Sequence, residues 1–68
     1  MPKLYSSRHI IAVLTKKGFI EIDQTGSHKK LRKDDRTVIV PSPRKEMPHG
    51  TFASILRQSG LNKSDFEK

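Results

Sequence analysis

The apolar residues of this chain change their spacing twice, and this change of period constrains the fold more than any other feature. Residues 7–17 carry isoleucine, valine and leucine at intervals of three and four, which is typical of one buried helix face. Residues 19–40 instead hold short alternating or β-branched runs between polar turns, which is typical of strands. Residues 51–60 return to helical spacing around Phe52 and Ile55. The order of elements therefore predicts an α+β fold.

Residue types at the segment ends predict where the helices begin and end. The first helix should begin at a serine cap, Ser6 or Ser7, because a serine hydroxyl accepts a hydrogen bond from a first-turn amide. It should end at Gly18, which tolerates the left-handed backbone that follows many helices. Thr51 should cap the second helix, and Gly60 should end it.

The strands are expected at residues 19–24, 28–33 and 37–40. Short turns join them, so they should form a three-stranded antiparallel meander. Pro41 should end the last strand because proline has no amide hydrogen to donate. The loop 41–48 holds three prolines and is long enough to suggest a recognition role. Both helices should cover one sheet face and leave the other wet, in α-β-β-β-α order.

A chain of 68 residues has room for one domain, residues 1–68, with one small core. A final helical turn is expected to start at Ser64. The core is expected to draw on Ile10, Leu14, Phe19, Ile20 or Ile22, Leu31, Val38, Val40, Ile55 and Leu56. There is no cysteine, no apolar signal segment and no run long enough to span a membrane, so a cytoplasmic location is expected.

The net charge of +7 favours a polyanionic partner, and nucleic acid is the first candidate. Half of the fourteen lysines and arginines lie in one stretch: Lys29, Lys30, Arg32, Lys33, Arg36, Arg44 and Lys45. This stretch could form a track of phosphate contacts, which position a nucleic acid without reading its sequence. No aromatic residue lies in the basic strand, so shape and backbone recognition fits better than base stacking.

One histidine stands at the start of the basic strand. Because strand side chains alternate, His28, Lys30 and Arg32 should share one face, while Leu31 points to the helices. A solvent-facing histidine beside cations could take the proton of an RNA 2′-hydroxyl as a general base. The pattern alone favours the plainer interpretation, a strand residue that only contacts phosphate or water, and it leaves the catalytic one open.

The other histidines carry weaker signals. His9 should lie in the first turn of the first helix, where a polar residue is ordinary. His49 precedes the second helix, whose N-terminus favours anions, so a substrate contact is expected there. Neither a metal site nor a cofactor is expected, since no histidine pair has ligand spacing and no phosphate-binding loop motif is present.

Taken together, several motifs resemble the HicA family of toxin–antitoxin mRNA interferases. They are Gly26-Ser27-His28, Val40-Pro41, Gly50-Thr51, Ile55-Leu56 and Gly60-Leu61. The resemblance implies a double-stranded-RNA-binding-like fold and RNA cleavage by one histidine, which matches His28. It implies a HicB-type antitoxin as partner, with operator DNA bound only through that antitoxin. Ser27, which precedes His28 in the first motif, is also expected to contact the RNA. Family members often carry a histidine where this chain has Ser42.

The leading hypothesis is thus a metal-independent endoribonuclease toxin that acts on mRNA with His28 as its general base. A non-catalytic RNA-binding module is the alternative, because the chain offers only one plausible catalytic group. A DNA-binding regulator ranks last, since no recognition helix with base-reading residues stands out. A basic toxin should also meet an acidic antitoxin surface.

Overall fold

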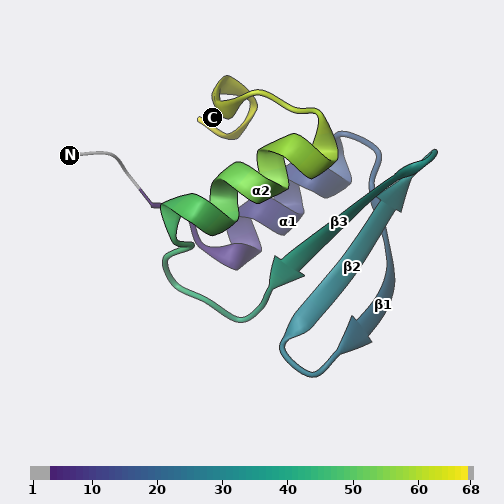
Figure 1. Ribbon diagram of the computed structural model, residues 1–68, viewed down its shortest axis with the longest axis horizontal. Coiled ribbons are helices and arrows are strands. Elements are labelled where there is room, and N and C mark those ends of the chain that lie inside the picture. Colours follow the sequence, from purple (N-terminus) through teal and green to yellow (C-terminus); the bar gives the residue numbers. More distant parts are fainter. Residues whose placement is uncertain (1–3, 68) are drawn as a thin grey trace.

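The computed structural model describes residues 4–67 and shows two helices packed against one face of a three-stranded sheet (Figure 1). The elements are α1 (Ser7–Lys16), β1 (Ile20–Thr25), β2 (His28–Lys33), β3 (Arg36–Pro41), α2 (His49–Ser59) and a 3₁₀ helix, η1 (Lys63–Phe66). This order and layering confirm the expected α-β-β-β-α fold. The expectation that the chain has no apolar signal segment rests partly on residues 1–3. These residues lie outside the described residues.

The sheet is an antiparallel meander in the order β1-β2-β3. β2 pairs with β3 without interruption, from His28 opposite Pro41 to Lys33 opposite Arg36. β3 is an edge strand, and α2 partly closes this edge because the Ile39 amide donates to the Gln58 side chain (3.1 Å). β1 is the other edge, and it lies furthest from the helices (Figure 1). No helix among the described residues spans a membrane.

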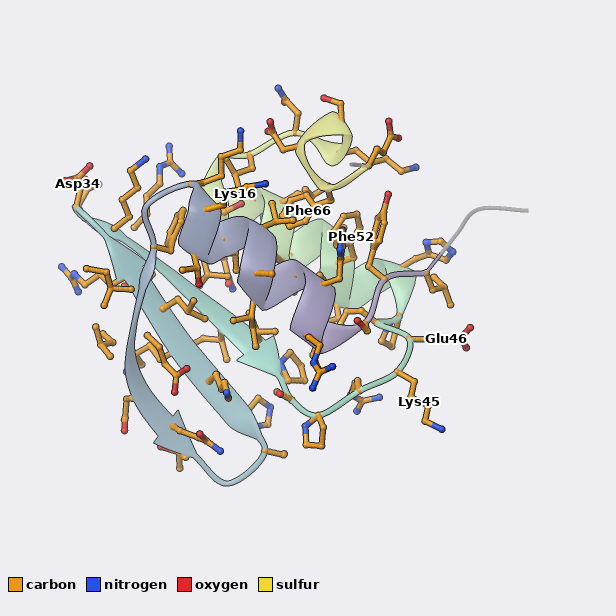
Figure 2. The ribbon with its side chains drawn as sticks, turned by 180° about the vertical axis from the view of Figure 1, so that it is seen from behind. Lys16, Asp34, Lys45, Glu46, Phe52 and Phe66 are labelled. Atoms are coloured by element: carbon orange, nitrogen blue, oxygen red, sulfur yellow. The ribbon has the colours of Figure 1, made fainter. Side chains whose placement is uncertain are left out.

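The core lies between the helices and the inner face of β2 and β3. Its buried members are Ile10, Leu14, Phe19, Leu31, Val38, Val40, Met47, Phe52, Ile55 and Phe66. Seven of the expected core residues are therefore confirmed, and Leu56 is half-buried against the cluster. Met47 and Phe66 were not expected. Figure 2 shows Phe66 beside Phe52, where the C-terminal segment folds over the helices.

The expectation that Ile20 or Ile22 enters the core is wrong, because they are 68% and 51% exposed. A bulge between Glu21 and Asp23 shifts the pairing of β1 with β2. It places Ile20 opposite Arg32, on the open face, although unbroken alternation would have turned it inward. The helices also leave β1 uncovered, so every residue of this strand is exposed.

Two expected helix caps are also wrong. α2 begins at His49 with Pro48 as its N-cap, so Thr51 lies inside the first turn. Proline fits the start of a helix, where its missing amide hydrogen costs nothing. Asn62 rather than Ser64 caps η1, since it and Asp65 form a reciprocal capping box. The Ser6 cap of α1 is confirmed, because its side chain accepts the His9 amide (3.1 Å).

Gly60 ends α2 in the left-handed conformation, with φ of 74°. We expect Gly60→Ala to lower the free energy of unfolding by about 1–3 kcal/mol, because an L-residue is strained there. A Cβ would also meet the Arg36 guanidinium at 2.8 Å, which a flexible side chain can partly relieve. Urea unfolding measures the effect. Gly50→Ala is the matched control, since Gly50 is helical with open space around it, and a comparable loss there would contradict the explanation.

Candidate active site

The sheet face opposite the helices is open to solvent and carries the basic side chains of β2. Leu31 is fully buried under the helices, while its neighbours Lys30 and Arg32 are exposed. His28 is exposed as well and shares the face of Lys30, two residues or about 7 Å along the strand. The alternation of β2 therefore turns an imidazole and an ammonium group to the same solvent-facing surface.

His28 lies at a recess of about 130 Å³ on this open face. The lining residues are Asp23, Thr25, His28, Lys29, Lys30 and Ile39. Thr25 pairs directly with His28, and Asp23 pairs with Lys30, so β1 contributes a hydroxyl and a carboxylate beside β2. The recess thus brings together an imidazole, a cation and a carboxylate from two neighbouring strands.

The carboxylate of Asp23 is held by its own strand. It accepts the Gln24 amide (2.8 Å) and the Thr25 hydroxyl (3.5 Å). In contrast, the His28 and Lys30 side chains have neither a hydrogen bond nor an ion pair within residues 4–67. These two groups therefore remain available to a bound molecule.

Three of the expected RNA-contacting cations, of which Lys29 also lines the recess, are engaged by other groups of the protein. The Lys29 ammonium pairs with Glu21 (3.5 Å), on the helix side of the sheet. Lys33 donates to the carbonyl of Lys17 (2.8 Å), and Arg36 donates to the carbonyl of Gln58 (3.4 Å). Lys33 and Arg36 lie opposite each other on the neighbouring strands β2 and β3. This position is about 17 Å along the sheet from His28.

Arg32 occupies an intermediate place on the open face. Its Nε donates to the carbonyl of Asp34 (3.1 Å), at the hairpin tip that Figure 2 labels. The single basic track that the sequence suggests is therefore divided. Lys30 adjoins His28, Arg32 points toward the far turn, and the side chains of Lys29, Lys33 and Arg36 are engaged by other groups.

The remaining expected contacts lie at the end of the sheet where His28 is found. The Ser42 amide donates to the carbonyl of Ser27 (2.6 Å), which ties the loop after β3 to the turn before His28. This loop carries Arg44 and Lys45, both exposed, and leads to His49, the first residue of α2. Folding thus brings the backbone of the loop that carries Arg44 and Lys45 next to the turn that precedes His28.

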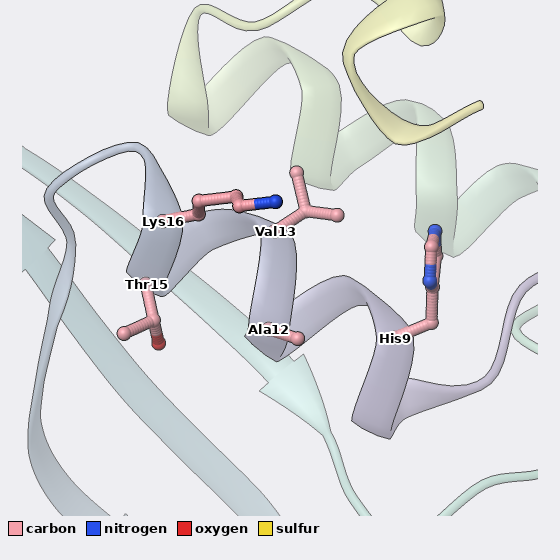
Figure 3. A pocket seen from close by; sticks show the side chains of 5 residues that line it. All are labelled: His9, Ala12, Val13, Thr15 and Lys16. Atoms are coloured by element: carbon pink, nitrogen blue, oxygen red, sulfur yellow. The ribbon is translucent and has the colours of Figure 1, made fainter. Parts of the chain in front are cut away.

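A larger cavity of about 400 Å³ lies along α1, but it lacks a comparable group of reactive side chains. It is lined by His9, Ala12, Val13, Thr15 and Lys16, with His9 at one end and Lys16 toward the other (Figure 3). The His9 ring donates to the carbonyl of Phe66 (2.7 Å) and stacks on Tyr5, with 4.9 Å between ring centroids. His9 therefore has a structural role.

Sequence reasoning missed Asp23, Thr25 and Ile39 as neighbours of His28. A signal for the first two was present, because the two-residue turn at Gly26-Ser27 places Thr25 opposite His28 and Asp23 on the same face. Within residues 4–67, no three His, Cys, Asp or Glu side chains gather as metal ligands.

The fold and the site together define a class of protein. It is a small α+β protein of the double-stranded-RNA-binding-like type, with an exposed histidine on the open, basic face of its sheet. Residues 7–61 match the family described as the HicA toxin of bacterial toxin–antitoxin systems. The chain belongs to this family. No match was found among curated proteins.

As a member of this family, the chain is the toxin of a toxin–antitoxin system. Such a system implies an antitoxin partner. The match begins at the first residue of α1 and ends just after α2, so it includes the whole sheet and both helices. It also includes the recess and His28.

Proposed function

We propose that the protein is a metal-independent endoribonuclease that cleaves mRNA, with His28 as the general base. The observation that carries this proposal is the position of His28. It is an unpaired imidazole in a recess beside Lys30, on the open face of a chain that belongs to a toxin family. Cleavage of mRNA would inhibit translation, which accounts for toxicity.

The reaction needs only one side chain to begin. Neutral His28 takes the proton of a ribose 2′-hydroxyl, and the 2′-oxygen attacks the adjacent phosphorus. The bond between phosphorus and the 5′-oxygen breaks, and the leaving oxygen takes a proton from water. The products are a 2′,3′-cyclic phosphate and a 5′-hydroxyl end, and imidazolium returns its proton to solvent. Lys30 lies where it can stabilise the negative charge that grows on the phosphate.

The RNA is held by its backbone in this proposal. Lys30 and Arg32 offer charge on the open face, Arg44 and Lys45 extend it beyond the end of the sheet, and Ser27 adds a neutral hydroxyl. His49 adds an imidazole at the N-terminus of α2, where the first amides of a helix favour an anion. Such contacts position a strand without reading its sequence.

The partner that family membership implies is proposed to be a HicB-type antitoxin. An acidic antitoxin surface would complement the charge of +7 and could cover the open face of the sheet. Binding of operator DNA would then occur through the antitoxin rather than through this chain.

A non-catalytic RNA-binding module is the second candidate. The recess offers one unpaired imidazole, and its carboxylate, Asp23, is already engaged by its own strand. This candidate predicts RNA binding with no cleavage, so an activity measurement separates the two.

Incubation of the purified protein with RNA in excess EDTA is expected to yield fragments with 2′,3′-cyclic phosphate ends, because no step needs a metal ion. In a matched oligonucleotide, a single 2′-deoxyribose at the cleaved position should remove that cut, since the attacking oxygen is missing. Gel electrophoresis and mass spectrometry of the fragments measure both results. RNA that stays intact, or cleavage at the deoxy position, would contradict the proposal.

A further inference from the structure

A second recess lies where the loop between β3 and α2 meets the start of α1. Its volume is about 510 Å³, and its lining residues are Ser6, Ser7, Arg8, Pro43, Arg44 and Lys45. Three of the six are cations, and none is acidic. Figure 2 shows the side chains of Lys45 and the neighbouring Glu46 pointing outward from this loop. The recess therefore gathers positive charge from two segments far apart in the sequence.

The walls of this recess are held together by Ser7, which is 3% exposed. Its amide donates to the carbonyl of Arg44 (2.9 Å), and its hydroxyl accepts the amide of Arg44 (3.0 Å). The Met47 amide also donates to the carbonyl of Tyr5 (2.7 Å), and the Met47 side chain is buried. The loop is thus fastened on both sides of Lys45, to the first residue of α1 and to the segment just before it, which keeps Arg8 and Arg44 at one recess.

The cations of the recess have no anionic partner of their own. Within residues 4–67, the side chains of Arg8, Arg44 and Lys45 make neither an ion pair nor a hydrogen bond. Like charges that line one recess repel one another, so an anion bound there would relieve the repulsion. Two of the three are arginines, whose planar fork matches a phosphate group.

The recess is joined to the His28 site by a short piece of chain. The Ser42 amide bonds to the residue before His28, and Arg44 follows two residues later, at most about 7 Å of extended backbone. A strand with its scissile phosphate at His28 can therefore reach the recess with a neighbouring phosphate.

We propose that this recess binds backbone phosphates of the RNA next to the scissile phosphate, with Arg8 and Arg44 as direct contacts and Lys45 adding charge. The proposal rests on the proposed ribonuclease function and adds Arg8, on α1, to the substrate-binding surface. It assigns the recess to RNA rather than to an acidic protein because the Ser42 amide ties the loop that forms the recess to the turn before His28.

The test measures binding separately from cleavage. A labelled single-stranded 2′-O-methyl RNA, which cannot be cleaved by 2′-hydroxyl attack, is titrated by fluorescence anisotropy at several salt concentrations. We expect Arg8→Gln/Arg44→Gln to raise Kd about tenfold at low salt. The slope of log K against log salt should become shallower by about 1.4, because two phosphate contacts are lost.

Two further variants serve as controls. Arg57→Gln/Lys63→Gln removes the same charge from α2 and η1, on the side of the helices away from the sheet, and should stay within about twofold of the parent. Arg8→Lys/Arg44→Lys keeps the charge and should keep the salt slope. Equal losses in the glutamine variant and the control would overturn the proposal, because the effect would then be one of net charge.

Kinetics on cleavable RNA provide a second readout. The glutamine variant should raise KM about tenfold and leave kcat within about twofold, whereas on a dinucleotide with a single phosphate it should match the parent. A loss of antitoxin affinity with unchanged RNA affinity would also overturn the proposal and assign the recess to the protein partner. If the parent fails to cleave RNA, the proposed function fails, and the anisotropy result still decides whether the recess binds phosphates.

Discussion

Replacement of His28 by alanine is expected to lower the rate of RNA cleavage about 10²–10⁴-fold, the contribution of one acid–base group. The 2′-hydroxyl then has to lose its proton to water, while Lys30 still offers its charge to the phosphate. Growth arrest on expression should disappear with the activity. Single-turnover cleavage of a labelled RNA measures the rate, and growth after induction measures the toxicity.

The fold should survive this substitution. His28 is exposed, and its side chain makes neither a hydrogen bond nor an ion pair within residues 4–67, so its loss breaks no such interaction. Circular dichroism and the thermal midpoint should match those of the parent. A loss of activity can then be assigned to chemistry or to substrate binding rather than to unfolding.

Two companion variants separate those remaining causes. His28→Gln keeps a polar side chain that can contact phosphate but cannot transfer a proton near neutral pH, so it should bind RNA and still fail to cleave it. Lys63→Ala, in η1 on the opposite side of the molecule, should cleave like the parent. Cleavage at the parent's rate by folded His28→Ala would remove His28 from the mechanism and favour another catalytic group.

The order of elements and the face of His28 could be predicted because both depend on local periodicity. A change between helical and strand spacing separates the helices from the sheet, polar turns separate the strands, and Leu31, the only apolar residue of β2, anchors the parity of that strand. The burial of Leu31 fixes the opposite face for His28 and Lys30. These inferences needed no knowledge of how neighbouring strands pair.

The errors in β1 have a different origin. Ile20 and Ile22 alternate as inward residues should, but the bulge changes the parity of Ile20, and the helices do not extend over this edge strand. A bulge leaves no reliable mark in a single strand, because it depends on how two strands fit together. Helix coverage likewise depends on how far the packed layers reach.

The second recess could not be predicted for a similar reason. Arg8 is 36 residues from Arg44 along the chain, and the two come together because Ser7 and Tyr5 bond to the loop backbone. A serine at a helix start is usually read as a cap, which is the role that Ser6 takes here. The sequence alone does not show that the next serine fastens a distant loop.

The substitution Phe66→Ala is expected to lower the free energy of unfolding by about 3–5 kcal/mol, the usual range for a buried phenylalanine. Phe66 is fully buried, and it meets Phe52 edge to face with 5.2 Å between ring centroids. A chain of this size has a total stability of about 3–10 kcal/mol. The variant should therefore be partly or largely unfolded at moderate temperature, and urea and thermal unfolding measure the loss.

Phe66 supports more of the structure than its own burial suggests. Its carbonyl accepts the His9 ring, and the η1 segment is further held to α1 by the ion pair between Lys17 and Asp65 (3.3 Å). Loss of the phenyl ring should loosen these contacts together, because they all require η1 to stay docked. Phe66 nevertheless lies beyond the family match, which ends at Leu61.

Variants at and next to this position distinguish core packing from a general effect of the C-terminal segment. Phe66→Leu keeps much of the buried volume and should cost less than Phe66→Ala. Glu67→Ala changes an exposed neighbour and should stay within about 0.5 kcal/mol of the parent. If the free energy of unfolding of Phe66→Ala lies within about 1 kcal/mol of the parent's, η1 packs on the helices without contributing to their stability. The predicted large loss would instead make η1 part of the folding unit that holds α1, and with it the recess at Arg8, in place.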